Sequence, residues 1–466
     1  MSEVGTAASP LRVAIIGAGP SGFYAAEHLY KQKGITVQVD LYDRLPTPFG
    51  LVRLGVAPDH QKIKSVTAVF DRIAQRPGFR FFGNVELGRD ISVDDLRDHY
   101  HQIIYTTGAQ TDRAMDVPGA DLDGHHPATE FVAWYNGHPD FCDLHFDLTQ
   151  EKVAVVGIGN VAMDVARILC RTPAELAQTD IADYALEALS HSNVKEVYVL
   201  GRRGPAQAAF TTPEIKELGE MEDTDVFTIA EEVELDSLSE ASLAESADRG
   251  TMRKVEIIQS YANNQPTGKA RKLFVRFLIS PTELYGDENG RVTAMKLVHN
   301  KLYKTDAGSL RPKATEKTEV IEVGLVFRSI GYLGVPLPGV PFNEKWGVIL
   351  NDNGRVTHPN TKEPLPGEYT AGWIKRGPSG VIGTNKPDAV ATVDLMLNDL
   401  KTGCHLHPTH PAPEAVASLI AQRQPHFFTY TDWQKLDALE LAKGAECGRP
   451  RLKFTSIEDM LAALGK

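Results

Sequence analysis

Val13-Ala-Ile-Ile-Gly17-Ala-Gly19-Pro-Ser21-Gly22 stands close to the N-terminus, and an apolar stretch with helical spacing follows it over residues 23–30. A β-branched run that meets the pattern G-x-G-x-x-G and leads into a helix is typical of a dinucleotide-binding turn. In such a turn, Gly17 permits the sharp bend, Gly19 lets a pyrophosphate approach the backbone, and Gly22 lets helix and strand pack closely. We therefore predict a strand, a turn and a helix whose first N–H groups bind phosphate. A glycine-rich turn that binds nothing is the alternative.

The strand that should follow, residues 36–42, ends at Asp43. A carboxylate at that position can accept hydrogen bonds from an adenosine ribose, and its charge would repel a 2′-phosphate. The first turn is therefore predicted to hold a dinucleotide whose ribose carries a free 2′-hydroxyl.

The pattern returns as Lys152-Val-Ala-Val-Val-Gly157-Ile158-Gly159-Asn160-Val161-Ala162, with alanine in place of the third glycine. The strand after it, residues 196–200, leads into Gly201-Arg202-Arg203. Paired guanidinium groups suit a 2′-phosphate through charge-assisted, bidentate contacts. The second turn is therefore predicted to bind NADP(H), and a solvated pair of surface arginines is the simpler alternative.

Two apolar strands that end in glycine, within residues 103–109 and 323–331, mark the places where the chain should pass between two domains. We predict an α/β protein with two Rossmann-like dinucleotide-binding domains, the second inserted into a split first one. Residues 1–110 and 330–466 would form an FAD-binding domain, and residues 111–329 an NADP-binding domain. FAD is the expected first nucleotide, because two dinucleotide sites of which one is specific for NADP(H) indicate hydride transfer to a flavin.

Local patterns predict a few further elements. We expect a helix over residues 62–75 and an antiparallel pair of strands over 272–281 and 292–301. The chain from Gly403 onwards should be a helical tail of mostly structural value. Residues 1–10 should be a short disordered lead-in.

Composition narrows the class of protein. The 466 residues carry a net charge of −12, so a nucleic-acid partner is not expected. No apolar run approaches the roughly 18 residues of a membrane span, and the N-terminus lacks the features of a secretory signal or a mitochondrial presequence, so we expect a cytoplasmic protein. The four cysteines include no C-x-x-C pair, so neither a redox dithiol nor a metal site is predicted.

Five longer stretches are more discriminating than the glycine patterns: residues 45–62, 80–85, 159–164, 201–214 and 371–385. On these stretches, and over nearly its whole length, the chain resembles the adrenodoxin reductase family of NADPH–ferredoxin reductases, particularly its bacterial members. The resemblance implies an oxidoreductase that acts on iron–sulfur proteins. Hydride would pass from NADPH to FAD, and single electrons would then pass to a ferredoxin, as in electron-transfer chains that supply cytochrome P450.

The resemblance also implies which residues contact the two nucleotides. The contacts to FAD would come from Gly19, Ser21, Asp43, Leu51, Val85, Trp373, Gly380, Val381 and Ile382. The contacts to NADP would come from Arg113, Ile158, Gly159, Asn160, Val161, Arg202, Arg203, Glu214 and Gly380. The family usually has glutamate where Asp43 stands, so the ribose contact is expected to be longer or bridged by water.

Two further residues are implied near the place where flavin and nicotinamide meet. His60 and Glu217 would serve as catalytic residues there by orienting the nicotinamide or tuning protonation of the flavin. The alternatives are a loop histidine bonded to backbone for His60 and a solvated helix carboxylate for Glu217.

Ferredoxins are acidic, so the resemblance implies transient docking through basic residues. The candidates are Arg253, Lys254, Lys269, Arg271 and Lys272, with an ordinary solvated face as the alternative. Two competing functions also stay open. One is an NADPH diaphorase or quinone reductase that uses small acceptors, and the other is a non-catalytic nucleotide-sensing module. Disulfide reductases of similar build are set aside because C-x-x-C is absent.

Overall fold

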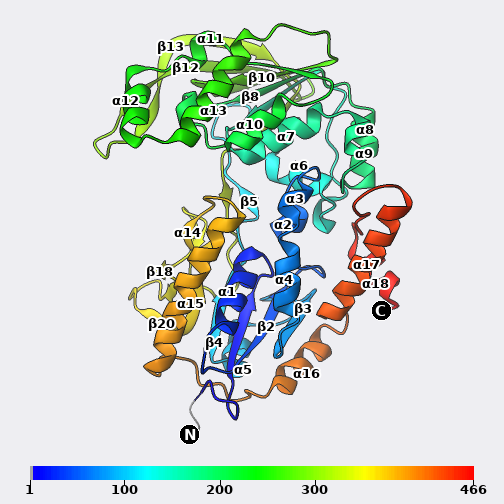
Figure 1. The fold of residues 1–466 in the computed structure, drawn as a ribbon, viewed down its shortest axis with the longest axis vertical. Helices are drawn as coiled ribbons and strands as arrows, with labels where there is room; N and C mark the ends of the chain where they lie inside the picture. The colour runs from blue at the N-terminus through cyan, green and yellow to red at the C-terminus, as the bar shows by residue number, and fades with distance from the viewer. Residues whose placement is uncertain (1–3) are drawn as a thin grey trace. The chain divides into compact units, whose positions relative to one another are not determined.

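The structure is a computed structural model that describes residues 4–466. Contacts divide these residues into two compact units (Figure 1). The first contains a mainly parallel β-sheet with two antiparallel pairings at one edge, and the second contains a parallel β-sheet. The first unit comprises the described residues up to Val56, His60–Thr111 and Tyr332–Lys466, and the second comprises Ala57–Asp59 and Asp112–Gly331. The assignment of FAD to the first part of the chain and of NADP to the second stays a prediction.

The sheet of the first unit has seven strands in the order β18-β19-β20-β4-β1-β2-β3. The interior strand β1 is parallel to both neighbours and buried along its whole length, because its alternate side chains pack into two separate apolar clusters, one on each face of the sheet. The strands of this unit are β1 (Leu11–Ile16), β2 (Val37–Asp43), β3 (Phe79–Gly83), β4 (Gln102–Tyr105), β15 (Tyr332–Leu333), β16 (Phe342–Asn343), β17 (Val348–Ile349), β18 (Asn351–Asp352), β19 (Arg355–Thr357) and β20 (Pro364–Thr370). Its helices are α1 (Pro20–Tyr30), α2 (Leu51–Leu54), α3 (Gln61–Lys64), α4 (Thr67–Ala74), α5 (Val93–His99), α14 (Trp373–Arg376), α15 (Asn385–Lys401), α16 (Pro413–Arg423), α17 (Tyr430–Glu446) and α18 (Ile457–Leu464).

The sheet of the second unit has six strands in the order β6-β14-β7-β8-β10-β9, and a separate antiparallel sheet has the order β11-β12-β13. The strands are β6 (His125–Pro127), β7 (Lys152–Val156), β8 (Glu196–Leu200), β9 (Thr224–Phe227), β10 (Arg271–Arg276), β11 (Ile279–Gly286), β12 (Val292–Lys304), β13 (Leu310–Glu322) and β14 (Leu325–Arg328). The α-helices are α6 (Ala128–Tyr135), α7 (Asn160–Cys170), α8 (Pro173–Leu176), α9 (Asp183–Ser190), α10 (Thr212–Leu218), α11 (Ala230–Val233), α12 (Ser237–Ser246) and α13 (Arg249–Ser260).

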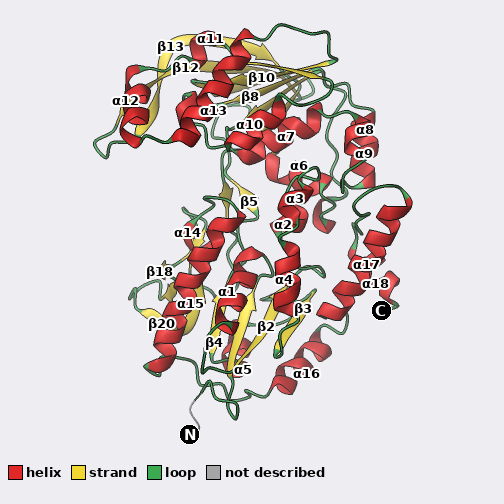
Figure 2. Cartoon of the chain, viewed as in Figure 1, coloured by secondary structure: helices red, strands yellow, loops and turns green. Residues whose placement is uncertain are grey.

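Figure 2 shows the strands of both sheets in yellow and the helices in red. The parallel parts of the two sheets repeat one arrangement of strands. In the first unit β1 lies between β2 and β4, and in the second β7 lies between β8 and β14. In each case the strand order reverses beside the first strand, and ligands of such sheets bind outside the carboxyl ends of the strands at that place. The predicted α/β class with two Rossmann-like folds is confirmed.

Two predicted elements differ from the structure. The single helix expected over residues 62–75 is two short helices, α3 and α4. The strand expected at 272–281 is broken: β10 is parallel to β8 and β9, and only β11 pairs with β12. The break falls at Leu278, whose φ of 56° is incompatible with a continuous strand.

The lead-in predicted as disordered is ordered where the structure describes it. The Gly5 N–H donates to Ser9 O at 2.7 Å, and the Thr36 N–H donates to Gly5 O at 2.7 Å. These bonds attach residues 5–9 to the segment before β2. Residues 1–3 lie outside the described residues. No helix within residues 4–466 is both long enough and apolar enough to cross a membrane.

Candidate functional site

The first glycine turn follows β1 and is built from backbone. Gly17 has a φ of +108°, and a Cβ there would lie 2.7 Å from Thr106 O, so only glycine fits. A Cβ on Gly22 would overlap Gly17 O. Gly19 is different, because its φ of −83° suits any residue and its Cβ would meet no atom within 4 Å. The protein itself gives no reason for glycine at this position, and the open space beside it fits a pyrophosphate.

The second glycine turn, after β7, repeats this geometry. Gly157 has a φ of +135°, and a Cβ there would overlap Ser329 O. Gly159 has an ordinary φ of −108°, and its Cβ would meet nothing within 4 Å. Both α1 and α7 begin at a glycine that provides no side-chain cap, so their first N–H groups have no capping side chain. The residues of both turns therefore fit bound phosphates.

Asp43 stands at the end of β2, beside the first turn. Its carboxylate accepts hydrogen bonds from the Ala18 N–H at 2.8 Å and from the Leu45 N–H at 3.0 Å. The Val85 N–H donates to Asp43 O at 2.9 Å, so this predicted FAD contact lies at the same strand end. Burial raises the pKa of Asp43, and the two backbone N–H groups oppose that rise. Each carboxylate oxygen keeps a further lone pair with which it can accept a ribose hydroxyl.

Arg202 and Arg203 stand at the equivalent place after β8. Arg202 is exposed and Arg203 is half-buried. Among residues 4–466 neither guanidinium forms an ion pair. Burial lowers the pKa of Arg203, and the charges of Arg202 and Arg311 lower it further. Neighbouring cations without a carboxylate favour a bound anion, as the NADP prediction requires.

The loop before α10 holds the second turn. The Thr211 N–H donates to Asn160 Oδ1 at 2.9 Å, and the Ala209 N–H donates to Ile158 O at 3.0 Å. Lys254 in turn donates to Ala208 O at 2.5 Å. The predicted NADP contacts Ile158 and Asn160 are thus fixed by the segment that follows the arginine pair.

The loop between β2 and α2 packs on the first turn through a strained residue. Phe49 has a φ of +86°, which is costly for a bulky side chain. Its N–H donates to Ala18 O at 2.8 Å, and its buried ring lies 5.5 Å from the ring of Phe23 and 5.6 Å from that of Trp433. The predicted FAD contact Leu51 begins α2 immediately afterwards and is 37% exposed, an unusual fraction for a leucine beside a core.

The C-terminal helices hold α2 through a buried ion pair. Arg53 and Glu440 form a bidentate pair with distances of 2.5 and 2.8 Å, and Glu440 has no exposed surface. Arg451 donates to the same carboxylate at 3.0 Å. Burial alone would raise the pKa of Glu440, but Arg53 and Arg451 outweigh it and lower that pKa. The helical tail therefore has a definite task, which is to fix the loop that faces the first turn.

The segment between β20 and α15 contains the remaining predicted FAD contacts. Trp373 donates from Nε1 to Ser379 O at 3.2 Å, and Val381 is 50% exposed. The Gly372 N–H donates to Asp388 at 2.6 Å, and a Cβ on Gly372 would overlap Ser21 Oγ. The structure thus brings Ser21 of the first turn together with the segment that carries Trp373, Gly380, Val381 and Ile382.

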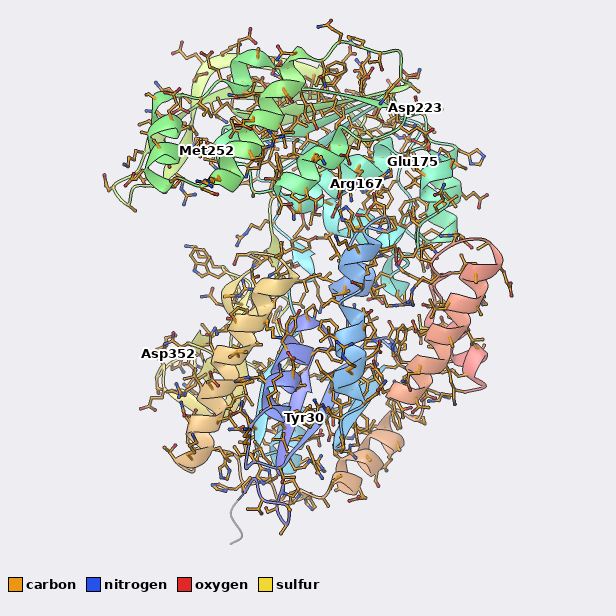
Figure 3. The ribbon with its side chains drawn as sticks, in the orientation of Figure 1. Tyr30, Arg167, Glu175, Asp223, Met252 and Asp352 are labelled. Atoms are coloured by element: carbon orange, nitrogen blue, oxygen red, sulfur yellow. The ribbon has the colours of Figure 1, made fainter. Side chains whose placement is uncertain are left out.

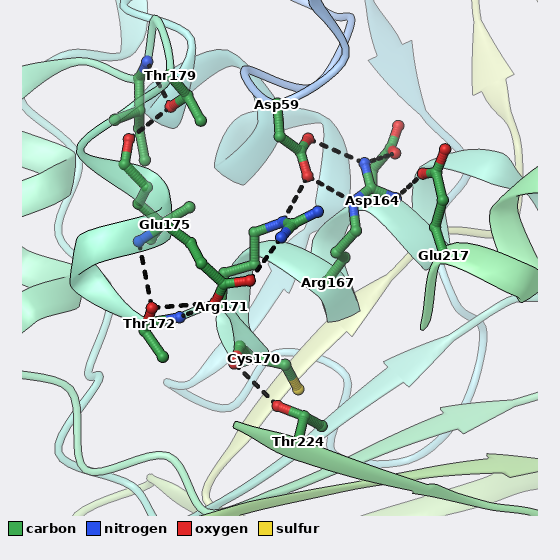
Figure 4. A network of polar contacts seen from close by, with 12 residues as sticks. Asp59, Asp164, Arg167, Cys170, Arg171, Thr172, Glu175, Thr179, Glu217 and Thr224 are labelled. Atoms are coloured by element: carbon green, nitrogen blue, oxygen red, sulfur yellow. Dashed lines mark hydrogen bonds and ion pairs between the residues drawn. The ribbon is translucent and has the colours of Figure 1, made fainter. Parts of the chain in front are cut away.

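Arg167 on α7 has no exposed surface, and carboxylates surround it (Figure 4). Its guanidinium donates to Asp59 at 2.7 Å, to Asp164 at 2.7 Å and to Glu214 at 3.1 Å. Burial would lower the pKa of Arg167, but these three carboxylates raise it well above its usual value. The network fixes α10, and with it Glu214, against the helix that follows the second turn.

Glu217 lies one helical turn after Glu214 on α10. Its carboxylate is 3.9 Å from the Arg167 guanidinium and its side chain is 37% exposed. It therefore stays accessible to solvent while Glu214 is buried.

The other predicted site residues belong to separate parts of the chain. His60 is the residue before α3 in the first unit and makes no capping bond with its side chain. Arg113 belongs to the second unit, where its N–H donates to Gly331 O at 3.0 Å. The structure describes His60 and Glu217 in different units, and their joint catalytic role stays a prediction.

Several proposed docking residues are engaged within the protein. Figure 3 labels Met252, which precedes Arg253 in the sequence, and Asp223, whose backbone oxygen accepts the Arg271 N–H at 3.2 Å. Lys254 is buried and donates to two backbone carbonyls, so the prediction that it contacts ferredoxin is wrong. Lys269 donates to Met221 O at 2.8 Å, and Arg253 pairs with Glu256 at 2.8 Å.

Comparisons with known proteins agree with this geometry. The family model described as pyridine nucleotide-disulphide oxidoreductase matches residues 11–203. The chain is 44% identical over 461 residues to NADPH-ferredoxin reductase FprA of Mycobacterium tuberculosis. The aligned region covers 97% of this chain and 98% of that one.

The chain belongs to the NADPH–ferredoxin reductase family. It is also 39% identical to the mitochondrial NADPH:adrenodoxin oxidoreductase of Arabidopsis thaliana, over 97% of this chain and 95% of that one. The solved structure of Mycobacterium tuberculosis FprA in complex with NADPH superposes with a TM-score of 0.91 at 43% identity, covering 98% of this chain and 100% of that one. The predicted resemblance to this family is confirmed.

Sequence reasoning missed the two buried arginine networks. Asp59 and Asp164 lie inside stretches that carried the resemblance, but nothing local indicates that both bind Arg167. Arg53 and Glu440 are 387 positions apart, so no motif connects them. An acidic residue at a regular apolar spacing within α17 is the only signal that could have singled out Glu440.

Proposed function

We propose that this protein is an FAD-dependent NADPH–ferredoxin oxidoreductase that oxidises NADPH and delivers electrons singly to a ferredoxin. One observation carries the proposal. Two glycine turns of the same geometry lie in one chain, and the strand beside one ends in a carboxylate while the strand beside the other ends in two unpaired arginines. FAD, when bound, supplies hydride acceptance and the change from two-electron to one-electron chemistry.

The residues of the first unit hold the flavin dinucleotide. The turn at Gly19 leaves room for the pyrophosphate, and the first N–H groups of α1 face it. Asp43 accepts the adenosine ribose hydroxyls with the lone pairs that the backbone does not use. Trp373 and the segment up to Ile382 border the ring system, with an aromatic side chain beside accessible backbone.

The residues of the second unit hold NADPH. Gly159 leaves room for its pyrophosphate, and Arg202 and Arg203 bind the 2′-phosphate through charge-assisted bonds. Arg113 and Glu214 complete the set of polar groups in this unit. His60 and Glu217 orient the nicotinamide or tune flavin protonation, and neither has to move a proton during the hydride step.

The acceptor is an acidic iron–sulfur protein that docks transiently, through an interface whose strength falls with salt. Lys254 is excluded from that interface by its burial, which leaves Arg253, Lys269, Arg271 and Lys272 as candidates. A cytoplasmic location is part of the proposal, in keeping with four cysteines that are all free thiols.

The decisive test of the nucleotide assignment is the double variant Arg202→Ala, Arg203→Ala. We expect the KM for NADPH to rise by about 100-fold, because two charge-assisted contacts to the 2′-phosphate are lost. The KM for NADH should barely change, since NADH has no 2′-phosphate. Equal losses with both nucleotides would show that the arginines serve another purpose.

The acceptor is tested separately by steady-state rates with a ferredoxin and with small quinones or dyes. The proposal expects reduction of ferredoxin well above the rate supported by free FAD, with strong dependence on salt. A rate no better than that of free FAD would favour the diaphorase alternative, and a purified protein without flavin absorbance would favour a nucleotide sensor.

A further inference from the structure

A cavity of about 320 Å³ lies beside the arginine pair of the second unit. Three segments far apart in the sequence form its walls: the turn after β8, helix α12, and the turn between β12 and β13. The polar side chains that line it are Arg202, Arg203, Gln207, Ser239, Ser242, Ser309 and Arg311. Among residues 4–466 no carboxylate lines it, although the chain as a whole is acidic, with a net charge of −12.

Arg311 makes this cavity more basic than the sequence pattern suggests. It stands near the start of β13, more than 100 residues after the arginine pair, and its side chain is exposed. Among residues 4–466 it forms no ion pair, like Arg202 and Arg203. The three guanidinium groups are close enough for Arg202 and Arg311 together to lower the pKa of Arg203. Three mutually repelling cations around one cavity are stabilised most by a multivalent anion.

The walls of the cavity are held in place by bonds of their own. Asn300 on β12 donates to Arg202 O at 3.0 Å, and the Leu278 N–H donates to Arg203 O at 3.1 Å. The Asn300 side chain thus fastens the β12–β13 hairpin to the arginine turn, and the Asn300 N–H also donates to Leu278 O at 2.6 Å. The hairpin therefore carries Arg311 to a defined place.

Helix α12 is fixed in the same way. Asp236 caps it by accepting the Ser239 N–H at 3.0 Å and the Ser239 hydroxyl at 2.9 Å. Gln207 then donates to Ser239 Oγ at 3.0 Å and connects the helix to the segment after the arginine pair. The hydroxyl of Ser242, one helical turn later, lines the cavity without a bond of this kind.

We propose that Arg311 is a third guanidinium for the 2′-phosphate of NADPH, and that this cavity receives the phosphorylated adenosine ribose. The proposal rests on the function proposed above and extends it to a specificity-determining residue on the β12–β13 hairpin. A phosphomonoester carries about −1.5 to −2 charges near pH 7, which two arginines only balance. A third arginine leaves the filled site with a net charge of about +1, so the dianion is attracted more strongly than by a pair that only neutralises it.

The test measures binding directly, with the flavin-loaded protein and calorimetric titration of 2′,5′-ADP and of ADP. Arg311→Gln removes the charge at an exposed position, so the fold should be retained, and thermal unfolding checks this. We expect its dissociation constant for 2′,5′-ADP to rise about tenfold, and its affinity for ADP to stay unchanged. The dependence of 2′,5′-ADP binding on salt should also become shallower.

Lys313→Gln is the matched control, because Lys313 is exposed, stands two residues further along β13 and does not line the cavity. It should bind 2′,5′-ADP as the parent protein does. If both variants lost affinity for 2′,5′-ADP equally, the overall positive charge of the hairpin would matter rather than a contact from Arg311, and the proposal would be overturned.

The double variant Arg202→Ala, Arg203→Ala separates this inference from the function on which it rests. If that variant loses 2′,5′-ADP binding while Arg311→Gln does not, the inference about Arg311 fails and the NADP assignment stands. If neither variant loses selectivity for 2′,5′-ADP over ADP, the assignment of the second turn to NADP fails as well.

Discussion

The two glycine turns of this protein have the same backbone but different surroundings. In each, the first glycine packs against a carbonyl oxygen just after a neighbouring strand of the sheet, Thr106 O after β4 or Ser329 O after β14, and the second glycine faces open space. Beside the first turn, the carboxylate of Asp43 is engaged by two backbone N–H groups. Beside the second, the guanidinium groups of Arg202 and Arg203 form no ion pair within residues 4–466.

This difference shows how one type of fold can hold a tightly bound ligand, the proposed FAD, at the first turn and a ligand that exchanges, the proposed NADPH, at the second. The loop over the first turn is fixed by a strained Phe49 and by the buried pair Arg53–Glu440. The second turn instead presents cations that only an incoming anion can pair. Preorganised, satisfied surroundings favour slow release, whereas exposed charges favour rapid, salt-dependent association.

Valine substitutions at the two open glycines should produce the largest contrast. Gly19→Val should yield nearly flavin-free protein, because its side chain would occupy the space that fits the pyrophosphate of FAD. Gly159→Val should keep its flavin but raise the KM for NADPH by about 100-fold. The measurements are flavin absorbance per protein and steady-state kinetics.

Neither valine meets a protein atom at its Cβ, so both variants should fold, which circular dichroism can check. Normal flavin content in Gly19→Val, or loss of flavin in Gly159→Val, would show that the two turns have been assigned in the wrong order.

Glu440→Gln tests whether the tail preserves the first site. The change leaves Arg53 buried without its charged partner, which typically costs about 3–5 kcal/mol. We expect a lower melting temperature and faster loss of flavin on dilution. Gln424→Glu, an exchange of the same two residue types in the opposite direction at a half-buried position after α16, is a matched control that should leave flavin release unchanged. Unchanged release in Glu440→Gln would separate the tail from flavin binding.

The features of each site that depend on residues close together in the sequence could be predicted. The positive φ of Gly17 and Gly157, the order of strand, turn and helix, and the placement of an acid or arginines at the next strand end all follow from local pattern. Arg311 and Glu440 could not be predicted, because Arg311 stands more than 100 residues after the arginine pair and Glu440 is 387 positions from Arg53, so both contacts form only when the chain folds. The break at Leu278 was missed for a related reason, since the hairpin bonds rather than strand propensity hold its unusual backbone.

A smaller contrast in stability is expected at the third position of the glycine pattern, which is Gly22 in the first turn and Ala162 in the second. Gly22→Ala should destabilise the first unit by about 1–3 kcal/mol, because the new Cβ would overlap Gly17 O. The second turn already carries Ala162 there, so Ala162→Gly should cost only about 1 kcal/mol through helix propensity. Chemical denaturation of both variants, followed by flavin fluorescence and by circular dichroism, measures the two effects. A harmless Gly22→Ala would mean that helix α1 can shift as α7 has.

The smallest expected contrast is between the starts of β1 and β7, and it concerns how acid affects the stability of each. At the start of β1, His101 Nδ1 accepts the Arg12 N–H at 3.0 Å, whereas β7 begins with the exposed pair Lys152–Glu322. Burial lowers the pKa of His101 to about 4, with smaller effects from His405, Arg12 and His407. An unfolded histidine titrates near pH 6.5, so below that value the unfolded chain takes up a proton that the folded chain refuses.

The free energy of unfolding should therefore be full above pH 6.5 and fall as the pH approaches 4, by about 1–2 kcal/mol once screening by solvent is allowed for. His101→Asn keeps an acceptor near the Nδ1 position and removes the titration. We expect flavin release in denaturant to become less dependent on pH in this variant. An unchanged pH dependence would place the acid sensitivity of the first unit at other groups, and would remove this distinction between the two strands.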